Sequence, residues 1–213
     1  GGTLTMDATT SGITAAGTAT FTATSGITIN DTFSMSTGTV TFNSDMSVTT
    51  LSVTGGTLEG SGDITVTSAM TWSGGATIGG TGTLTTNSGV TTTIPTNNGP
   101  ILSRTWENNG TINWTNTNGN SFTINGTLNN NSGANFNIVT DNSSTDILGT
   151  GTINNAGTLT LNSTASELDV SPTFNNTGTV TVTDGDLQLA GTGIDTGIYT
   201  VASGATLTFA NAS

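Results

Sequence analysis

The chain has 213 residues, a net charge of −12 and no cysteine, lysine or histidine. Thirteen acidic residues against one base, Arg104, disfavour binding to nucleic acid and to anionic membrane surfaces, because like charges repel. No apolar run approaches the ~20 residues that a membrane helix needs, and the first residues do not form a signal peptide. Without cysteine no disulfide can stabilise the fold.

The composition favours strands over helices. Threonine occurs 53 times, glycine 30 times and asparagine 24 times, and all three have low helix propensity. Threonine, valine and isoleucine favour strands. Apolar residues are 31% of the chain and alternate with polar ones, which argues against a disordered chain. An all-β fold is expected.

Strand-like alternation begins at Thr3 and continues from Ala15 to Thr24. The glycines that open the next strands stand at positions 17, 38 and 56, separated by 21 and 18 residues. Later openings at 89, 110, 133, 157, 178 and 204 are separated by 21, 23, 24, 21 and 26 residues. A period in the low twenties is typical of a repeat protein.

One repeated unit combines an Asn/Gly turn with an alternating strand. Glycine and asparagine tolerate the left-handed backbone that tight turns need, and the alternation indicates a half-buried strand. The copies of this unit are Asn108 to Trp114, Asn131 to Ile138, Asn154 to Leu161 and Asn175 to Val182.

This pattern predicts a single-stranded, right-handed parallel β-helix, or β-solenoid, with coils of about 20 to 24 residues that hold two or three strands each. An antiparallel β-sandwich is the alternative, since its turns also recur every 8 to 12 residues. We expect one continuous solenoid over residues 1–213, with an irregular seam or loop at 95–107. Within that seam, we interpret Arg104 and Glu107 as a local ion pair.

Alternate residues of a strand share a face, so the apolar residue of each pair is expected inside the coil. The residues expected inside are Ile112, Trp114, Phe136, Ile138, Leu159, Leu161, Val180 and Val182, with Thr158, Thr160, Thr179 and Thr181 outside. Inward asparagines at the coil corners are expected to form amide ladders. The candidates are Asn109, Asn155 and Asn176.

Several stretches resemble the Gly/Thr-rich repeats of large secreted bacterial surface proteins of the filamentous-haemagglutinin-like or autotransporter-like β-helix class. The stretches are Leu58 to Val66, Met70 to Leu84, Phe174 to Val180 and Val201 to Phe209, and the likeness covers most of residues 56 to 209. The resemblance implies secretion, a parallel β-helix and a stalk or adhesive role. It brings no catalytic residue with it.

Two carboxylate pairs have the i, i+2 spacing that places them on one face of a strand ~7 Å apart. Glu167 with Asp169 and Asp184 with Asp186 could serve a polysaccharide hydrolase, but neither pair has an aromatic platform or a third acid beside it. Asp184 and Asp186 could also contact calcium, although two acids are too few for a site. We therefore expect no catalytic residue, no cofactor and no enzyme.

Nine Asn-x-Ser/Thr sequons could carry glycans if the host glycosylates surface proteins. They begin at Asn30, Asn109, Asn113, Asn125, Asn130, Asn142, Asn162, Asn175 and Asn211.

Outward Thr-x-Thr motifs raise an ice-binding alternative, because flat threonine ladders are the arrangement that ice-binding proteins use. The motifs begin at Thr83, Thr158, Thr179 and Thr206. The pattern is not confined to one strand of each coil, and Asn113 and Asn135 interrupt it.

The function predicted from the sequence is a non-enzymatic extracellular structural or adhesive segment of a cell-surface fibre. The repeat pattern runs from Thr3 to Phe209 without a charged or helical cap, and an open end of a solenoid exposes unpaired strand edges. We therefore expect the ends to be covered by neighbouring repeats or by another copy stacked head to tail. Surface glycans are further possible partners. A polysaccharide-binding or polysaccharide-degrading β-helix is the other alternative.

Overall fold

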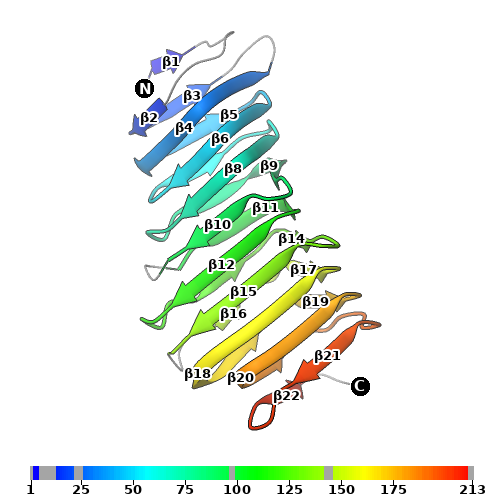
Figure 1. Cartoon of the computed structure of the whole chain (residues 1–213). Helices are drawn as coiled ribbons and strands as arrows, with labels where there is room; N and C mark the ends of the chain where they lie inside the picture. The colour runs from blue at the N-terminus through cyan, green and yellow to red at the C-terminus, as the bar shows by residue number, and fades with distance from the viewer. Residues whose placement is uncertain (1, 5–12, 22–25, 96–98, 142–145, 211–213) are drawn as a thin grey trace.

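The computed structural model describes residues 2–4, 13–21, 26–95, 99–141 and 146–210. In this part of the chain 22 strands stack into a β-solenoid of about 9 turns, with β1 and β22 at opposite ends (Figure 1). All described strand pairings are parallel, as between β12 and β15 and between β15 and β18. The predicted parallel solenoid is confirmed, and the antiparallel alternative is wrong. No helix that could cross a membrane occurs among the described residues.

Each full coil has three sides, named here after their outward side chains. The hydroxyl side is formed by β2 (Ile13–Ala16), the later parts of β4 (Ile27–Thr37), β6 (Met46–Val53) and β8 (Ile64–Trp72), β10 (Thr91–Ile94), β12 (Thr111–Asn116), β15 (Asn135–Thr140), the first parts of β18 (Thr158–Val170) and β20 (Thr179–Leu189), and β21 (Ile198–Val201).

The carboxylate side is formed by β1 (Gly2–Leu4), β3 (Ala19–Phe21), β5 (Thr39–Phe42), β7 (Thr57–Glu59), the first parts of β9 (Thr77–Thr86) and β11 (Ile101–Asn108), β13 (Phe122–Ile124), β16 (Asp146–Leu148), the last parts of β18 and β20, and β22 (Thr206–Phe209). The amide side is formed by the first parts of β4, β6 and β8, the last parts of β9 and β11, β14 (Thr127–Asn130), β17 (Thr152–Asn155) and β19 (Thr173–Asn176).

Several long strands turn a corner and so belong to two sides. Their pairing shifts register at the corner, as between Ile29 and Thr32 in β4 and between Leu161 and Glu167 in β18. Such irregularities bend a strand. Between the corners the register is regular, so equivalent residues of successive coils lie over one another.

The core is a narrow column of apolar side chains fed by alternate residues of all three sides. All eight residues predicted to point inward are buried, with exposed fractions of 2% or less. The four threonines predicted to point outward are only partly buried. In the middle of the stack, Trp72 packs edge-on against Trp106 and Phe122, with ring centroids 5.9 and 5.5 Å apart. The alternating pattern therefore correctly assigns the inside of the coil.

The corner between the carboxylate and amide sides is packed too tightly for a side chain at Gly126. A Cβ atom there would lie 2.1 Å from the carbonyl oxygen of Arg104 in the coil above, and 2.6 Å from its nitrogen. These are distances that real Cβ atoms do not adopt, so glycine at this corner is a requirement of stacking.

The expected seam at residues 95–107 is partly occupied by a regular strand. Residues 96–98 lie outside the described part of the chain, but β11 begins at Ile101 and pairs with β9 on one edge and with β13 and β14 on the other. The stack therefore continues through the second half of the predicted seam.

Arg104 does not form the predicted ion pair with Glu107, because it points into the corner of the coil and is only 3% exposed. Its Nε donates to the carbonyl oxygen of Gly82 at 2.6 Å, and its Nη2 donates to that of Gly62, two coils away, at 2.9 Å. Burial lowers the pKa of Arg104 to about 10, an effect that the charge of Asp63 opposes. The single base of the chain thus joins three coils.

Candidate functional surfaces

The hydroxyl side presents two straight columns of outward residues along the solenoid. In each hydroxyl-side strand from β4 to β21, the two column residues flank one inward residue, as Thr179 and Thr181 flank Val180. One column is Thr32, Thr50, Ala69, Thr91, Thr111, Asn135, Thr158, Thr179 and Ile198; the other is Ser34, Ser52, Thr71, Thr93, Asn113, Asn137, Thr160, Thr181 and Thr200. Neither column contains a charged residue.

The structure sorts the Thr-x-Thr motifs onto different sides. The motifs at Thr158 and Thr179 lie on the hydroxyl side, whereas those at Thr83 and Thr206 lie on the amide and carboxylate sides. The expectation that the motif is not confined to one strand of each coil therefore holds. Sequence reasoning missed the columns themselves, because only three of the nine column triplets, those at Thr91, Thr158 and Thr179, are Thr-x-Thr, and the other triplets align with them only through strand register.

An inner ladder of asparagines lines the corner between the amide and hydroxyl sides. Each Nδ2 donates to the Oδ1 of the next coil: Asn108 to Asn130 at 2.9 Å, Asn130 to Asn155 at 2.8 Å and Asn155 to Asn176 at 2.9 Å. These partners are 22, 25 and 21 residues apart. At its start, Thr86 donates to Asn108 at 3.0 Å. The ladder satisfies the buried amides of its first three asparagines, whereas the Nδ2 of Asn176, at its end, has no hydrogen-bond partner among the described residues.

The predicted ladder members Asn155 and Asn176 are correct, and Asn109 is wrong by one position. Asn109 lies half-buried on the surface and accepts a hydrogen bond from Asn131. In the three predicted copies the inner asparagine stands three positions before the following strand, as Asn108 does before Thr111 and Asn155 does before Thr158. In the copy at Asn108 and Asn109, one residue fewer separates the asparagine pair from that strand, so the first asparagine of the pair is the inner one.

A second, outer ladder runs beside the first on the amide side. Asn154 donates to Asn129 at 2.7 Å, and Asn175 donates to Asn154 at 2.8 Å. At its end Glu107 accepts from Asn129 at 2.5 Å and from Asn131 at 3.0 Å. The side chain of Glu107 therefore belongs to this ladder.

The carboxylate side carries a patch of acids on adjacent strands. Asp169 lies opposite Asp146, and Glu167 lies opposite Asp186. Repulsion from Asp169 raises the pKa of Glu167, with smaller contributions from burial, Asp186 and Asp146. Burial raises the pKa of Asp146, and repulsion from Asp169 adds to this effect. Asp169 itself accepts a hydrogen bond from Gln188 at 2.6 Å.

The two predicted acid pairs have different geometry. Glu167 and Asp169 share one side, as expected from their spacing. Asp184 lies at the bend before Gly185, whose φ is 81°, and its Oδ1 accepts from the backbone N–H of that glycine at 2.9 Å. Asp186 lies beyond the bend, so Asp184 and Asp186 do not form a pair on one strand face. Within the described ranges no group of three or more acids is placed to hold a metal ion.

The carboxylate patch predicts the direction of the pH dependence of stability. A carboxylate whose folded pKa is raised destabilises the fold above that pKa, and the penalty disappears as pH falls below its unfolded pKa. The melting temperature should therefore rise as pH falls from 7 into the carboxylate range. Glu167→Gln should raise the melting temperature at pH 7 and should reduce the increase in melting temperature as pH falls. Ser132→Ala, in an exposed turn away from the patch, should leave the pH dependence of the melting temperature unchanged. Scanning calorimetry from pH 7 to 4 would measure this, and an unaltered pH profile in Glu167→Gln would contradict it.

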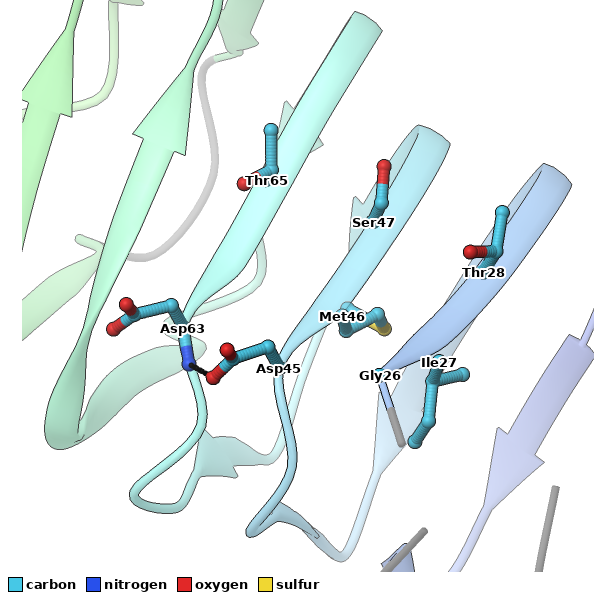
Figure 2. Close-up of a pocket in the computed structure, with 8 residues that line it drawn as sticks. All are labelled: Gly26, Ile27, Thr28, Asp45, Met46, Ser47, Asp63 and Thr65. Atoms are coloured by element: carbon cyan, nitrogen blue, oxygen red, sulfur yellow. Dashed lines mark hydrogen bonds between the residues drawn. The ribbon is translucent and has the colours of Figure 1, made fainter. Parts of the chain in front are cut away.

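A shallow hollow of about 320 Å³ opens on the amide side near β4, β6 and β8 (Figure 2). Thr28, Ser47 and Thr65 lie in a row across it, one from each strand (Figure 2). Asp45 accepts from the backbone N–H of Asp63 at 3.0 Å, and Asp63 accepts from that of Thr83 at 2.7 Å. Both carboxylates thus tie one coil to the next at the rim of the hollow.

The sequons differ in accessibility. Asn130 is 1% exposed inside the inner ladder, and Asn109 and Asn175 take part in surface hydrogen bonds. Asn113 accepts a hydrogen bond from Asn137 at 2.9 Å. The exposed sequon asparagines are Asn30, Asn125 and Asn162. Asn142 and Asn211 lie outside the described residues.

The last coil exposes apolar side chains that would be buried in any other coil. Val201 and Phe209 point inward in register with Val182 and Leu189, yet they are 41% and 44% exposed. Tyr199 packs edge-on against Phe209, with centroids 5.2 Å apart. β21 and β22 pair only with β20, so their other edges have no strand partner among the described residues. Residues 5–12 lie outside the described part of the chain.

Comparison of the chain with protein-family models, with curated proteins and with solved structures finds no match.

Proposed function

We propose that the chain is a non-enzymatic structural segment of an extracellular fibre, in which solenoids stack end to end. The observation that carries this proposal is the open last coil. Its inward residues Val201 and Phe209 are each exposed by about two fifths, and its outer strand edges have no partner among the described residues. An apolar end with free strand edges is a surface on which a further coil can pack and pair.

The rest of the molecule supports a scaffold role. The stability of the stack comes from repeated backbone pairing, an apolar column and two asparagine ladders, none of which requires a disulfide. The resemblance to repeats of secreted bacterial surface proteins agrees with an extracellular location. Immunogold labelling of intact source cells would test the location, and glycan arrays would test an adhesive role.

The occupant of the open end is either the next repeat of a longer chain or a second copy of this chain. In both cases the new coil would continue the three sides and bury the same apolar end. Between copies of this chain, a head-to-tail contact that does not close on itself gives a filament.

End-to-end association predicts a concentration-dependent rise in mass for the purified chain. Sedimentation velocity in ~0.15 M salt, which screens the net charge of −12, should show species larger than the 21.2 kDa monomer. Phe209→Glu and Phe209→Lys should both reduce association, because either charge would be buried at the joint. Ser132→Glu, which adds the same negative charge as Phe209→Glu but in an exposed turn, should leave association unchanged.

Using both charge signs separates loss of the apolar contact from a change in net charge. A monomer at all concentrations, with the amides of β21 and β22 as protected from hydrogen exchange as those of β20, would contradict the proposal. That result would mean that the last coil is stable without a cover.

A further inference from the structure

The hydroxyl side forms a two-dimensional array rather than a collection of separate threonines. Strands β4, β6, β8, β10, β12, β15, β18, β20 and β21 lie side by side along the solenoid, and their column residues pair without a register shift (Figure 1). Neighbouring strands are ~4.8 Å apart and alternate residues of one strand ~6.8 Å apart. The array therefore repeats in both directions on the scale of the oxygen spacings in an ice crystal.

We propose that the hydroxyl side binds ice. A threonine hydroxyl donates one hydrogen bond and accepts two, so it can take the place of a lattice water, while its methyl group lies against the water between hydroxyls. Threonine is stiff about χ1 because it is branched at Cβ, and strand register fixes its position. The array therefore loses little conformational entropy when it meets an ordered surface.

The charge distribution also favours this side. Both columns are free of charge from Thr32 to Thr200, although the chain carries thirteen acids. Other acids lie on the carboxylate side, as Asp169 does, and on the amide side, as Glu107 does. Asp31 lies beside the first column residue and accepts a hydrogen bond from Thr32 at 3.2 Å. A carboxylate would hold its own hydration shell and would interrupt a lattice of uncharged hydrogen-bonding groups.

A periodic ligand explains why one weak contact is repeated on so many coils. A single exposed hydroxyl contributes little, but contacts on a rigid array add without further loss of freedom once the first is made. Only a ligand with its own lattice can meet them all at once. A crystalline polysaccharide also has a lattice, but the two columns offer no aromatic ring on which sugar rings could stack.

The asparagines divide the array into two blocks richer in hydroxyls. Asn113 and Asn137 hydrogen-bond to each other at 2.9 Å in the middle of the stack. The block before them runs from β4 to β10, and the block after them covers β18 and β20. Each block should contribute to binding, so a change in one block should weaken binding and changes in both should abolish it.

The test is ice activity of the purified chain, measured as thermal hysteresis and as inhibition of ice recrystallisation. Thr93→Tyr, in the first block, and Thr160→Tyr, in the second, place a large ring above the plane but keep a strand-forming residue. Each should lower the activity by roughly tenfold, because the ring prevents simultaneous contacts, and the double variant should have none. Thr85→Tyr and Thr105→Tyr, on the amide side, are the matched controls and should retain full activity.

Circular dichroism and sedimentation would verify that all variants fold and associate like the original chain, which separates this proposal from fibre formation. Activity no higher than that of a non-binding protein at equal molarity would overturn the proposal. Equal losses in the amide-side controls would also overturn it, as would binding to crystalline cellulose or chitin without binding to ice.

Discussion

Replacing Asn155 by alanine is expected to destabilise the fold by about 3–5 kcal/mol, because it leaves several buried polar groups unpaired at once. Asn155 is 1% exposed and accepts from Asn130 at 2.8 Å. It also donates to Asn176 at 2.9 Å and to the carbonyl oxygen of Thr179 at 3.1 Å. Alanine removes all three hydrogen bonds and leaves a gap in the corner of the coil.

The neighbouring residue gives a matched control for this change. Asn154 also bonds to asparagines of the coils on either side, at 2.7 and 2.8 Å, but it is half-buried on the surface. Water can replace its partners, so Asn154→Ala should cost less than about 1 kcal/mol. Urea denaturation followed by circular dichroism would compare the two variants. Equal losses would show that the inner ladder adds nothing beyond the surface ladder.

Gly126→Ala should destabilise the stack by about 3 kcal/mol, because the added methyl group cannot be accommodated without moving a backbone. The methyl carbon would lie 2.1 Å from the carbonyl oxygen of Arg104. Moving that strand would disturb the neighbouring bonds from Arg104 to Gly82 and Gly62. The effect should reach three coils, and hydrogen exchange of their amides should rise together.

Gly79→Ala is the control for this second change. A Cβ atom at Gly79 would make ordinary contacts of 3.6 Å with Ser103 and 3.8 Å with Thr77. Its position inside β9 suits alanine, so its stability should change by less than about 1 kcal/mol. If both glycine variants were equally stable, the corner would be looser than the structure indicates.

Alternation of apolar and polar residues was enough to predict the class of fold, because in a coil with one narrow core every strand must obey it. Val180 and Val182, for example, are buried as their pattern predicts. The period was close as well, since ladder partners 21 to 25 residues apart match the spacing of the glycines. Extracellular location and fibre formation stay predictions.

The details that failed depend on turn length and register, which alternation does not specify. Asn109 was expected in the ladder, as were the second asparagines Asn155 and Asn176 of the other pairs. Asn108 lies there instead, because one residue fewer separates this pair from the next strand. Arg104 was expected to form a local ion pair with Glu107, because such surface pairs are common, yet the carbonyl oxygens of Gly62 and Gly82 lie in the corner and accept its hydrogen bonds.

The hydroxyl array could not be predicted from the sequence either, because alternation does not specify the register between strands. Thr50 and Thr71 belong to different columns, and only the paired strands show that Thr50 aligns with Ala69 and Ser52 with Thr71. A sequence scan for Thr-x-Thr finds motifs on all three sides and misses most of the columns.

The central claim is that this solenoid is built to be continued at its open end, and electron microscopy of the purified chain tests it most directly. The account predicts rods one solenoid wide that lengthen with protein concentration and shorten to single units in Phe209→Lys. Single short particles at every concentration, with β21 and β22 fully ordered, would contradict it.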